Sequence, residues 1–371
     1  MIDFFMKNYK KLFLFTTCLL VGFLVMTCKS SDSQEIEKPA KDLGEGANCY
    51  IIPEEGKYSF VPLHVSGKPI ENVKKVDWIW STKVNESNEQ KLLTNVSYEN
   101  GRVCLTATGE KGNIVIAAFD ENGKIVWVWH IWCTDTPKTM KYENGAVFMD
   151  RYLGAVSAEQ ADGKATWGLV WQWGRITPFF AGYDDTEWDV ANAFTEARKW
   201  TILNPKYNLE WKFDAHSVSI EEAIAQPTVF FYDKKTCDWH NNIDLKLWGS
   251  VKTDYDPSPA GYHIPQTSQW EELKNLVPKK DLSGATYTFG NNEAWWAASG
   301  GGREFDSGCN IIGEGDIFVW SSTAEYVTDP FAGMKDFPAA YRLIYQLKSN
   351  FLYLKAMGNR SFAHTIRCVA D

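Results

Sequence analysis

The chain has 371 residues, of which 44% are hydrophobic and 23% charged, and its formal net charge is −9. This length predicts two domains, because a single core rarely grows beyond about 250 residues. The acidic balance, with no basic block to offset it, argues against a nucleic-acid partner. The 17 Trp are compatible with sugar-stacking platforms and with the more common use of aromatic residues in core packing.

Residues 1–27 are predicted to form a signal peptide that ends at a lipid-modified cysteine. Lysines precede an apolar run over residues 12–26, which is too short to span a bilayer comfortably. The sequence before Cys28 resembles a bacterial lipobox, so Cys28 is the expected acylation site, and a plain signal peptide is the alternative. Met1 and Met6 are both possible starts.

Residues 28–46 are predicted to be a flexible tether, because they are rich in Ser, Asp, Glu and Lys and contain few large apolar side chains. Acidic residues soon after Cys28 resemble the surface-export signals of Bacteroidota lipoproteins. We therefore expect the protein to be anchored in the outer membrane by its lipid and displayed at the cell surface, with a periplasm-facing orientation as the alternative.

Residues 47–136 are predicted to form an immunoglobulin-like β-sandwich. The segment 76–81 alternates with the period of two that is typical of a strand. Asn-Gly pairs at 100–101 and 122–123 predict two-residue hairpin turns, since both central positions of a type I′ turn need positive φ.

The runs 114–119 and 124–132 are predicted to form one long hairpin. Its second strand is bulky on both faces, with Ile125, Trp127, Trp129 and Ile131 on one and Val126, Val128, His130 and Trp132 on the other. Such a strand is either central in the sandwich or covered by the neighbouring domain.

A second domain is predicted over residues 137–371, because Pro137 cannot donate to a strand ladder. It contains a long insertion at 183–258, with a helical pattern over 189–200 and a capping-box helix that opens at Ser219.

The segment 261–278 predicts a strand, a turn and a short helix. Ser268 is the expected N-cap, with Glu271 as its capping-box partner. Trp270, Leu273 and Val277 are expected to form the buried face, and Pro278 to end the helix.

Several motifs of the second domain resemble those of the Fibrobacter succinogenes major paralogous (FISUMP) domain. They are Gly261-Tyr262-His263-Ile264-Pro265, Met149-Asp150-Arg151, Gln172-Trp173-Gly174-Arg175, Gly300-Gly301-Gly302-Arg303, Trp320-Ser321-Ser322-Thr323 and Thr365-Ile366-Arg367-Cys368-Val369. The resemblance implies a C-type-lectin-like α+β fold, related to formylglycine-generating enzymes, in a Bacteroidota lipoprotein. Arg151 and Arg175, which lie inside these motifs, are expected to be buried hydrogen-bond donors.

The resemblance also bears on the cysteines. Ser258 stands where relatives commonly carry cysteine, so any disulfide that this position makes in relatives is absent here. Cys309 with Cys368 is the pair that we would test first as a disulfide, with buried free thiols as the alternative.

The sequence contains no motif for a metal, a nucleotide or a serine nucleophile. It lacks His-Glu-x-x-His, an EF-hand loop, the Gln/Glu-Pro-Asn/Asp motif of calcium-dependent lectins in the expected place, a phosphate loop and Gly-x-Ser-x-Gly. Formylglycine-generating chemistry needs a close cysteine pair, and Cys309 and Cys368 are far apart in the sequence. We therefore expect no cofactor and no catalysis.

The predicted binding site is the stretch from Asn291 to Gly308. Adjacent tryptophans on a strand point to opposite faces, so one of Trp295 and Trp296 would join the core. The other would form a stacking platform, with Arg303 and Glu304 as polar partners. The alternative is that both tryptophans pack between the core and the insertion.

The function expected from these features is non-catalytic recognition of a glycan or a protein at the cell surface. One alternative is a structural or adhesive component that assembles through the edge strands of the sandwich, like a fimbrial subunit. Another is an enzyme whose site is not recognisable from the sequence.

Overall fold

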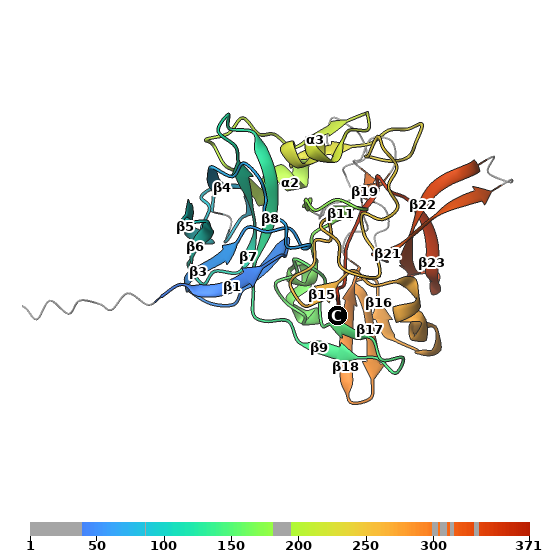
Figure 1. Cartoon of the computed structure of the whole chain (residues 1–371). Helices are drawn as coiled ribbons and strands as arrows, with labels where there is room; N and C mark the ends of the chain where they lie inside the picture. Colours follow the sequence, from blue (N-terminus) through green and yellow to red (C-terminus); the bar gives the residue numbers. More distant parts are fainter. Residues whose placement is uncertain are drawn as a thin grey trace, which may run out of the picture. The chain divides into compact units, whose positions relative to one another are not determined.

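The computed structural model describes residues 39–85, 87–180, 194–298, 303–304, 310–311, 315–329 and 334–371 (Figure 1). Residues 40–371 form one compact unit. The predicted signal peptide and Cys28 lie outside the described residues. Strands dominate the described unit, so the β-rich character predicted from the sequence is confirmed.

Two facing sheets are built mainly from residues 41–133. The first has the order β1-β3-β6-β5: Lys41–Glu45, Gly56–Val61, Arg102–Ala107 and Leu93–Glu99. The second has the order β12-β4-β7-β8-β2: Thr201–Leu203, Lys75–Thr82, Gly112–Phe119, Ile125–Cys133 and Cys49–Ile52. Phe60 of β3 meets Trp129 of β8 edge-on, with ring centroids 5.3 Å apart, so the space between the sheets is a hydrophobic core.

Two segments that were predicted to lie outside the sandwich contribute strands to it. Residues 41–45 of the predicted tether form β1, which pairs in parallel with β3 and packs Leu43 against the core. The tether prediction is therefore wrong for these residues. Strand β12, from the predicted insertion, pairs with β4 through Ile202 and Ser81.

The predicted hairpin of β7 and β8 is confirmed, and the turns are confirmed in part. Asn100 and Gly101 have φ of 51° and 76°, as a type I′ turn requires. At the second turn only Gly123 has positive φ, and its N–H donates to the Asp120 carbonyl at 3.1 Å. The Asp120 carboxylate accepts from the Asn122 N–H, which favours the longer turn.

The alternation predicted for 76–81 is interrupted. The register of β4 against β7 shifts between Trp78 and Trp80, so Ile79 and Trp80 are both fully buried while Trp78 is half-buried. A β-bulge explains this shift, because one extra residue reverses the faces that follow it.

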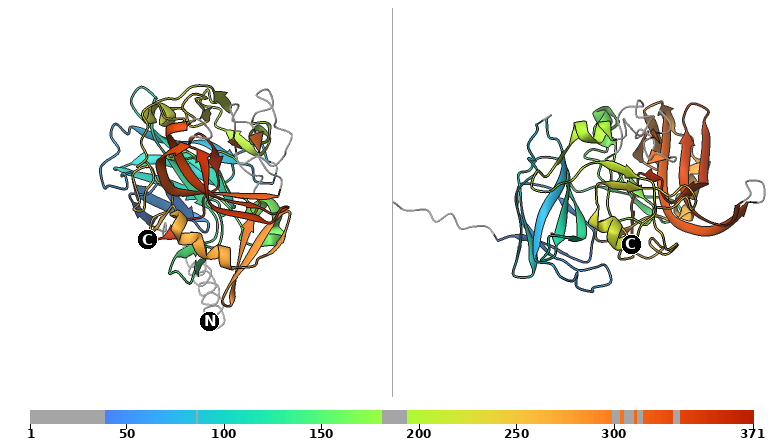
Figure 2. Two further views of the ribbon diagram at one scale, coloured as in Figure 1. Left: turned by 90° about the vertical axis from the view of Figure 1, so that its right-hand side faces the viewer. Right: turned by 90° about the horizontal axis from the view of Figure 1, so that it is seen from above.

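The remainder of the unit holds smaller sheets. Their strands are β9 Thr139–Lys141, β10 Val147–Met149, β11 Trp171–Gln172, β13 Lys212–Asp214, β14 Val229–Phe231, β15 Tyr262–His263, β16 Lys279–Asp281, β17 Gly284–Phe289, β18 Asn292–Ala297, β19 Arg303–Glu304, β20 Asn310–Ile311, β21 Asp316–Asp329, β22 Met334–Gln346, β23 Phe351–Asn359, β24 Ala363–His364 and β25 Val369–Ala370. They pair as β15-β25-β10-β9, β11-β24-β19-β20, β13-β14, β16-β17-β18 and β21-β22-β23. Figure 2 shows the long strands β21–β23, in red, at the end of the unit away from the sandwich strands.

The described helices are short: η1 Gln160–Thr166, α2 Thr195–Trp200, α3 Ile220–Ala225 and η2 Thr267–Asn275. The Ser219 cap is confirmed, since its hydroxyl accepts from the Glu222 N–H at 3.1 Å. No helix in the described part of the chain is long and apolar enough to cross a membrane.

The cap predicted for η2 is wrong by two residues. Gln266 caps the helix in a reciprocal pair with Gln269, and Ser268 lies inside the first turn. Trp270 and Leu273 are buried as predicted, but Val277 is 96% exposed. The helix is of the 3-10 type and ends at Asn275, so the buried stripe of a longer α-helix never reaches Val277.

Strand β8 is both central in its sheet and covered by the second half of the chain. The Trp132 indole donates to the Ala155 carbonyl at 3.1 Å, and the Asn113 side chain donates to the Gly154 carbonyl at 2.9 Å. One hydrophobic core continues from the sandwich into residues 149–180 and 194–264. The two bulky faces of β8 are explained because one packs against the facing sheet and the other against the second half of the chain.

Candidate ligand-binding pocket

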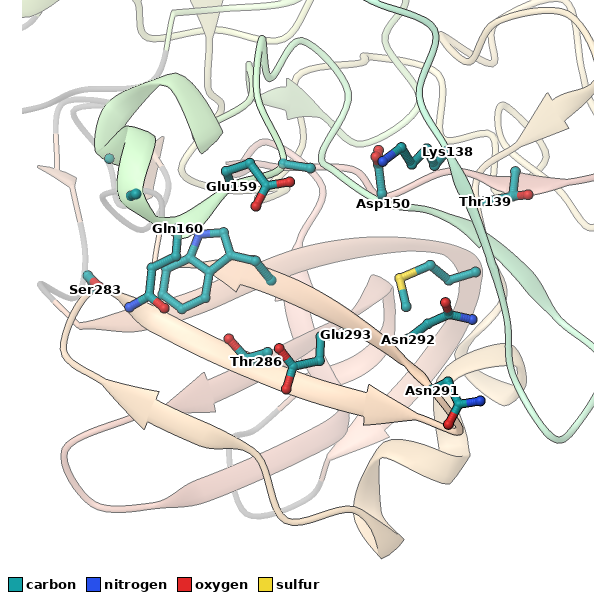
Figure 3. A pocket seen from close by; sticks show the side chains of 15 residues that line it. Lys138, Thr139, Asp150, Glu159, Gln160, Ser283, Thr286, Asn291, Asn292 and Glu293 are labelled. Atoms are coloured by element: carbon teal, nitrogen blue, oxygen red, sulfur yellow. The ribbon is translucent and has the colours of Figure 1, made fainter.

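A pocket of about 860 Å³ opens between η1, the segment before it and the β17–β18 hairpin (Figure 3). Its walls also include residues 138–140 and Asp150. The lining residues are Lys138, Thr139, Met140, Asp150, Ala158, Glu159, Gln160, Ala161, Gly163, Ser283, Thr286, Asn291, Asn292, Glu293 and Trp295.

Trp295 and Trp296 lie on opposite faces of β18, as predicted. Trp296 is fully buried, with its ring 4.5 Å from the Arg367 guanidinium and close to Tyr152. Trp295 is on the other face and lines the pocket with 9% of its surface exposed. Both tryptophans therefore belong to the hydrophobic core, as the alternative interpretation expected, and Trp295 also forms part of a pocket wall.

The Trp295 ring is fixed from two sides. Its indole N–H donates to the Thr166 hydroxyl at 3.2 Å. Strand β17 approaches it so closely that a Cβ added to Gly284 would lie 2.5 Å from the ring. Trp295 is consequently a rigid wall, and it presents only part of its surface to the pocket.

Ion pairs and hydrogen bonds fix several polar side chains around the pocket. Arg151 holds the Asp150 carboxylate through two bonds, of 2.9 and 3.1 Å. Asp281 accepts from the Gln160 side-chain amide at 3.1 Å, and the hydrogen bond from Ser283 lowers the pKa of the Asp281 carboxyl. These bonds reduce the side-chain entropy that a ligand would have to remove on binding.

Carboxylates and amides face the space from opposite walls. Figure 3 shows Glu159 on the η1 side and Glu293 on β18, with Asn291 and Asn292 at the end of the hairpin. Glu293 also pairs with Lys279 at 2.8 Å. Amide and carboxylate groups beside an aromatic wall are suited to a ligand that carries several hydroxyls.

The other predicted site residues lie partly beyond what is described. Arg303 and Glu304 form β19, which pairs with β24 through Arg303 and Ala363, but their side chains lie outside the described part of the structure. Cys309 lies outside the described residues as well. In the segments that are described, no cluster of His, Cys, Asp and Glu is arranged to hold a metal ion.

Cys368 is a free thiol in the described structure, and Cys309, its predicted disulfide partner, lies outside the described residues, so that pairing stays a prediction. The Sγ of Cys368 lies 3.4 Å from the Ser258 hydroxyl, and burial raises the pKa of the thiol to about 12. The residue opposite Cys368 is thus Ser258, and the two side chains are joined by a hydrogen bond.

A second thiol, that of Cys49, lies beside a histidine as the thiol of a catalytic cysteine does, but it is buried and its pKa is raised. The Cys49 Sγ lies 3.4 Å from Nδ1 of His130, and Nε2 of His130 lies 2.8 Å from Asn113 Oδ1. Burial raises the pKa of Cys49 and lowers the pKa of His130 to about 3. Both groups are neutral and buried, so the array links three neighbouring strands of one sheet, β2, β8 and β7, inside the core.

Arg151 and Arg175 are buried donors, as predicted. Arg175 donates to the Gln172 side chain at 2.8 Å and to backbone carbonyls of Val229, Ala223 and Gln226. Its role is to join the Gln172 segment to the insertion.

The sequence predicts the hairpin part of the pocket but not the rest. Asn291, Asn292 and Glu293 belong to the predicted stretch, whereas Glu159 and Gln160 do not. No local motif marks these two residues, because only the folding of η1 against β18 brings them to Trp295. Comparison of the chain with models of known protein families, with curated proteins and with solved structures finds no match.

Proposed function

We propose that this protein is a lipid-anchored surface protein that binds a glycan in the pocket beside Trp295, without catalysis. The observation that carries the proposal is the combination of an aromatic wall, side-chain amides and opposed carboxylates in one cavity. The proposed architecture is an immunoglobulin-like β-sandwich followed by a C-type-lectin-like α+β domain, as the resemblance to FISUMP sequences implies.

The chemistry of the lining supports a sugar ligand. Each sugar hydroxyl both donates and accepts hydrogen bonds, and the rim offers acceptors on Glu159 and Glu293 and amides on Gln160, Asn291 and Asn292. The volume of about 860 Å³ falls in the range of ligand pockets, which is about 300–1,000 Å³. A short oligosaccharide therefore fits better than a single monosaccharide.

A glycan array with the purified protein tests this proposal. Asn292→Ala and Glu293→Gln change exposed side chains, so they should leave folding intact and weaken binding of the best glycan by about tenfold, because each removes hydrogen bonds to the ligand. Asn95→Ala, an exposed change on β5, is the matched control and should bind as the wild type does.

The glycan should also be recovered intact after long incubation with the protein. Equal binding by all four proteins would place the ligand elsewhere. Cleavage of the glycan would contradict the non-catalytic part of the proposal.

One observation favours a second candidate, self-assembly through β23. This strand is at the edge of its sheet, and Phe351, Tyr353 and Met357 are exposed on it. Exposed apolar side chains on an edge strand are typical of assembly surfaces. Sedimentation that depends on concentration, and is abolished by Tyr353→Lys, would support this function in place of glycan binding.

A further inference from the structure

A second pocket, of about 420 Å³, lies where the start of β8 faces α3 and the 64–72 segment. Four parts of the chain that are distant in sequence meet there: His64 and Glu71 from one, Trp127 from β8, Glu221 from α3, and Tyr255. It shares no lining residue with the pocket beside Trp295, so a ligand in the second pocket is independent of the proposed function.

Rings form the floor of this second pocket. Trp127 is 4% exposed, and its indole N–H donates to Asn48 at 3.1 Å, which fixes the ring. His64 meets Trp127 edge-on with centroids 4.4 Å apart, and the Tyr255 ring lies 6.1 Å from Trp127. The faces of aromatic rings attract an organic cation.

Among the described residues, Nδ1 of His64 has no hydrogen-bond partner although this atom is buried. Burial lowers the pKa of His64, so the ring is neutral near pH 7 and one of its nitrogens is an acceptor. This nitrogen is one of several buried polar atoms without a partner among the described residues.

Carboxylates surround the opening. Glu71 and Glu221 line the pocket against a single basic residue, Lys124. Hydrogen bonds from its own backbone N–H and from Ser219 lower the pKa of Glu221, so this carboxylate remains charged and held in place. Burial raises the pKa of Tyr255, and the charges of Glu221, Asp254 and Asp244 raise it further, which shows that the local field is negative.

We propose that this second pocket binds the guanidinium group of an arginine side chain presented by a partner protein. The planar guanidinium stacks on Trp127 and Tyr255, which a compact ammonium does less well. Its N–H groups donate to the Glu71 and Glu221 carboxylates that line the pocket.

Two probes of nearly the same shape, one with a charged guanidinium group and one with a neutral ureido group, test this inference on the full chain. Nα-acetyl-arginine methylamide should bind in a calorimetric or NMR titration. The neutral citrulline analogue, which has nearly the same shape, should bind at least about tenfold more weakly. Equal affinity for the two probes would overturn the inference, and so would no binding of the arginine probe at millimolar concentration.

Variants distinguish binding of the arginine probe in this pocket from its nonspecific attraction to an acidic protein. Glu221→Gln and Glu71→Gln should each weaken binding of the arginine probe by about five- to tenfold. The melting temperature should be unchanged in Glu71→Gln and slightly lower in Glu221→Gln, because the Glu221 carboxylate is stabilised in the first turn of α3. Glu271→Gln, an exposed change on η2, is the matched control and should have no effect. Losses of the same size in all three variants, or in none, would overturn the inference.

Discussion

Replacing Ser258 with cysteine should create a disulfide bond with Cys368. The two side-chain atoms that would be joined, Ser258 Oγ and Cys368 Sγ, are already 3.4 Å apart and fully buried. A small rotation about the two side-chain bonds brings sulfur atoms at these positions to bonding distance. Both residues lie in well-packed backbone, so the bond constrains the unfolded chain far more than the folded one.

The expected stabilisation follows from the length of the loop that the bond closes. Positions 258 and 368 are 110 residues apart. Chain-entropy arguments give about 4–5 kcal/mol for a loop of this length, and strain in the folded state lowers this figure. For a unit of this size we expect a rise in melting temperature of about 5–10 °C.

The assay compares Ser258→Cys, Ser258→Ala and wild type after refolding in a glutathione redox buffer. Peptide mapping without reductant should find the 258–368 link in the first variant only, and reductant should abolish its extra thermal stability. Ser258→Ala should be slightly less stable than wild type, because the Cys368 thiol loses its partner. Failure of the link to form, or a link without any rise in melting temperature, would refute the geometry.

Three further predictions concern the core. Trp296→Ala should cost about 3–5 kcal/mol in urea unfolding, whereas Val277→Ala, at an exposed position, should change stability by less than about 0.5 kcal/mol. Gly284→Ala should destabilise by more than about 2 kcal/mol, since its Cβ would lie 2.4 Å from the Trp296 carbonyl oxygen, and a neutral effect would contradict the packing. Burial lowers the pKa of His130 in the folded protein to about 3, so the free energy of unfolding should fall as the pH drops below about 6.5, the unfolded pKa, and should stop falling near pH 3. In His130→Gln, the loss of stability between pH 7 and 4 should be smaller by about 3 kcal/mol.

The sequence predicts correctly those turns and helix caps that depend on only one or two neighbouring residues. The Asn100-Gly101 turn and the Ser219 cap both form as expected, because each depends on the conformational preference or hydrogen bond of one or two residues. The opposite faces of Trp295 and Trp296 follow in the same way from the pleat of a strand.

Features that depend on tertiary packing were not predictable. The strand at Lys41–Glu45 looks like a solvated tether, because only Leu43 among its side chains packs against the core and its pairing with β3 is made by the backbone. The pairing of Ile202 with Ser81 joins residues far apart in the chain, with no motif at either end.

The pocket illustrates both cases. Its hairpin wall, from Asn291 to Trp295, could be identified from adjacent aromatic and amide residues. Its η1 wall, with Glu159 and Gln160, becomes part of the site only because Thr166 accepts a hydrogen bond from Trp295 and Asp281 accepts one from Gln160. No sequence spacing encodes those two contacts.

The most direct test of glycan recognition is a crystal structure of the protein with the best-binding oligosaccharide from the array. We expect the sugar to lie between Glu159 and Glu293, with a ring against the exposed part of Trp295 and hydroxyls bonded to Asn291 or Asn292. Sugar bound at any other surface, with this pocket empty, would contradict glycan recognition beside Trp295.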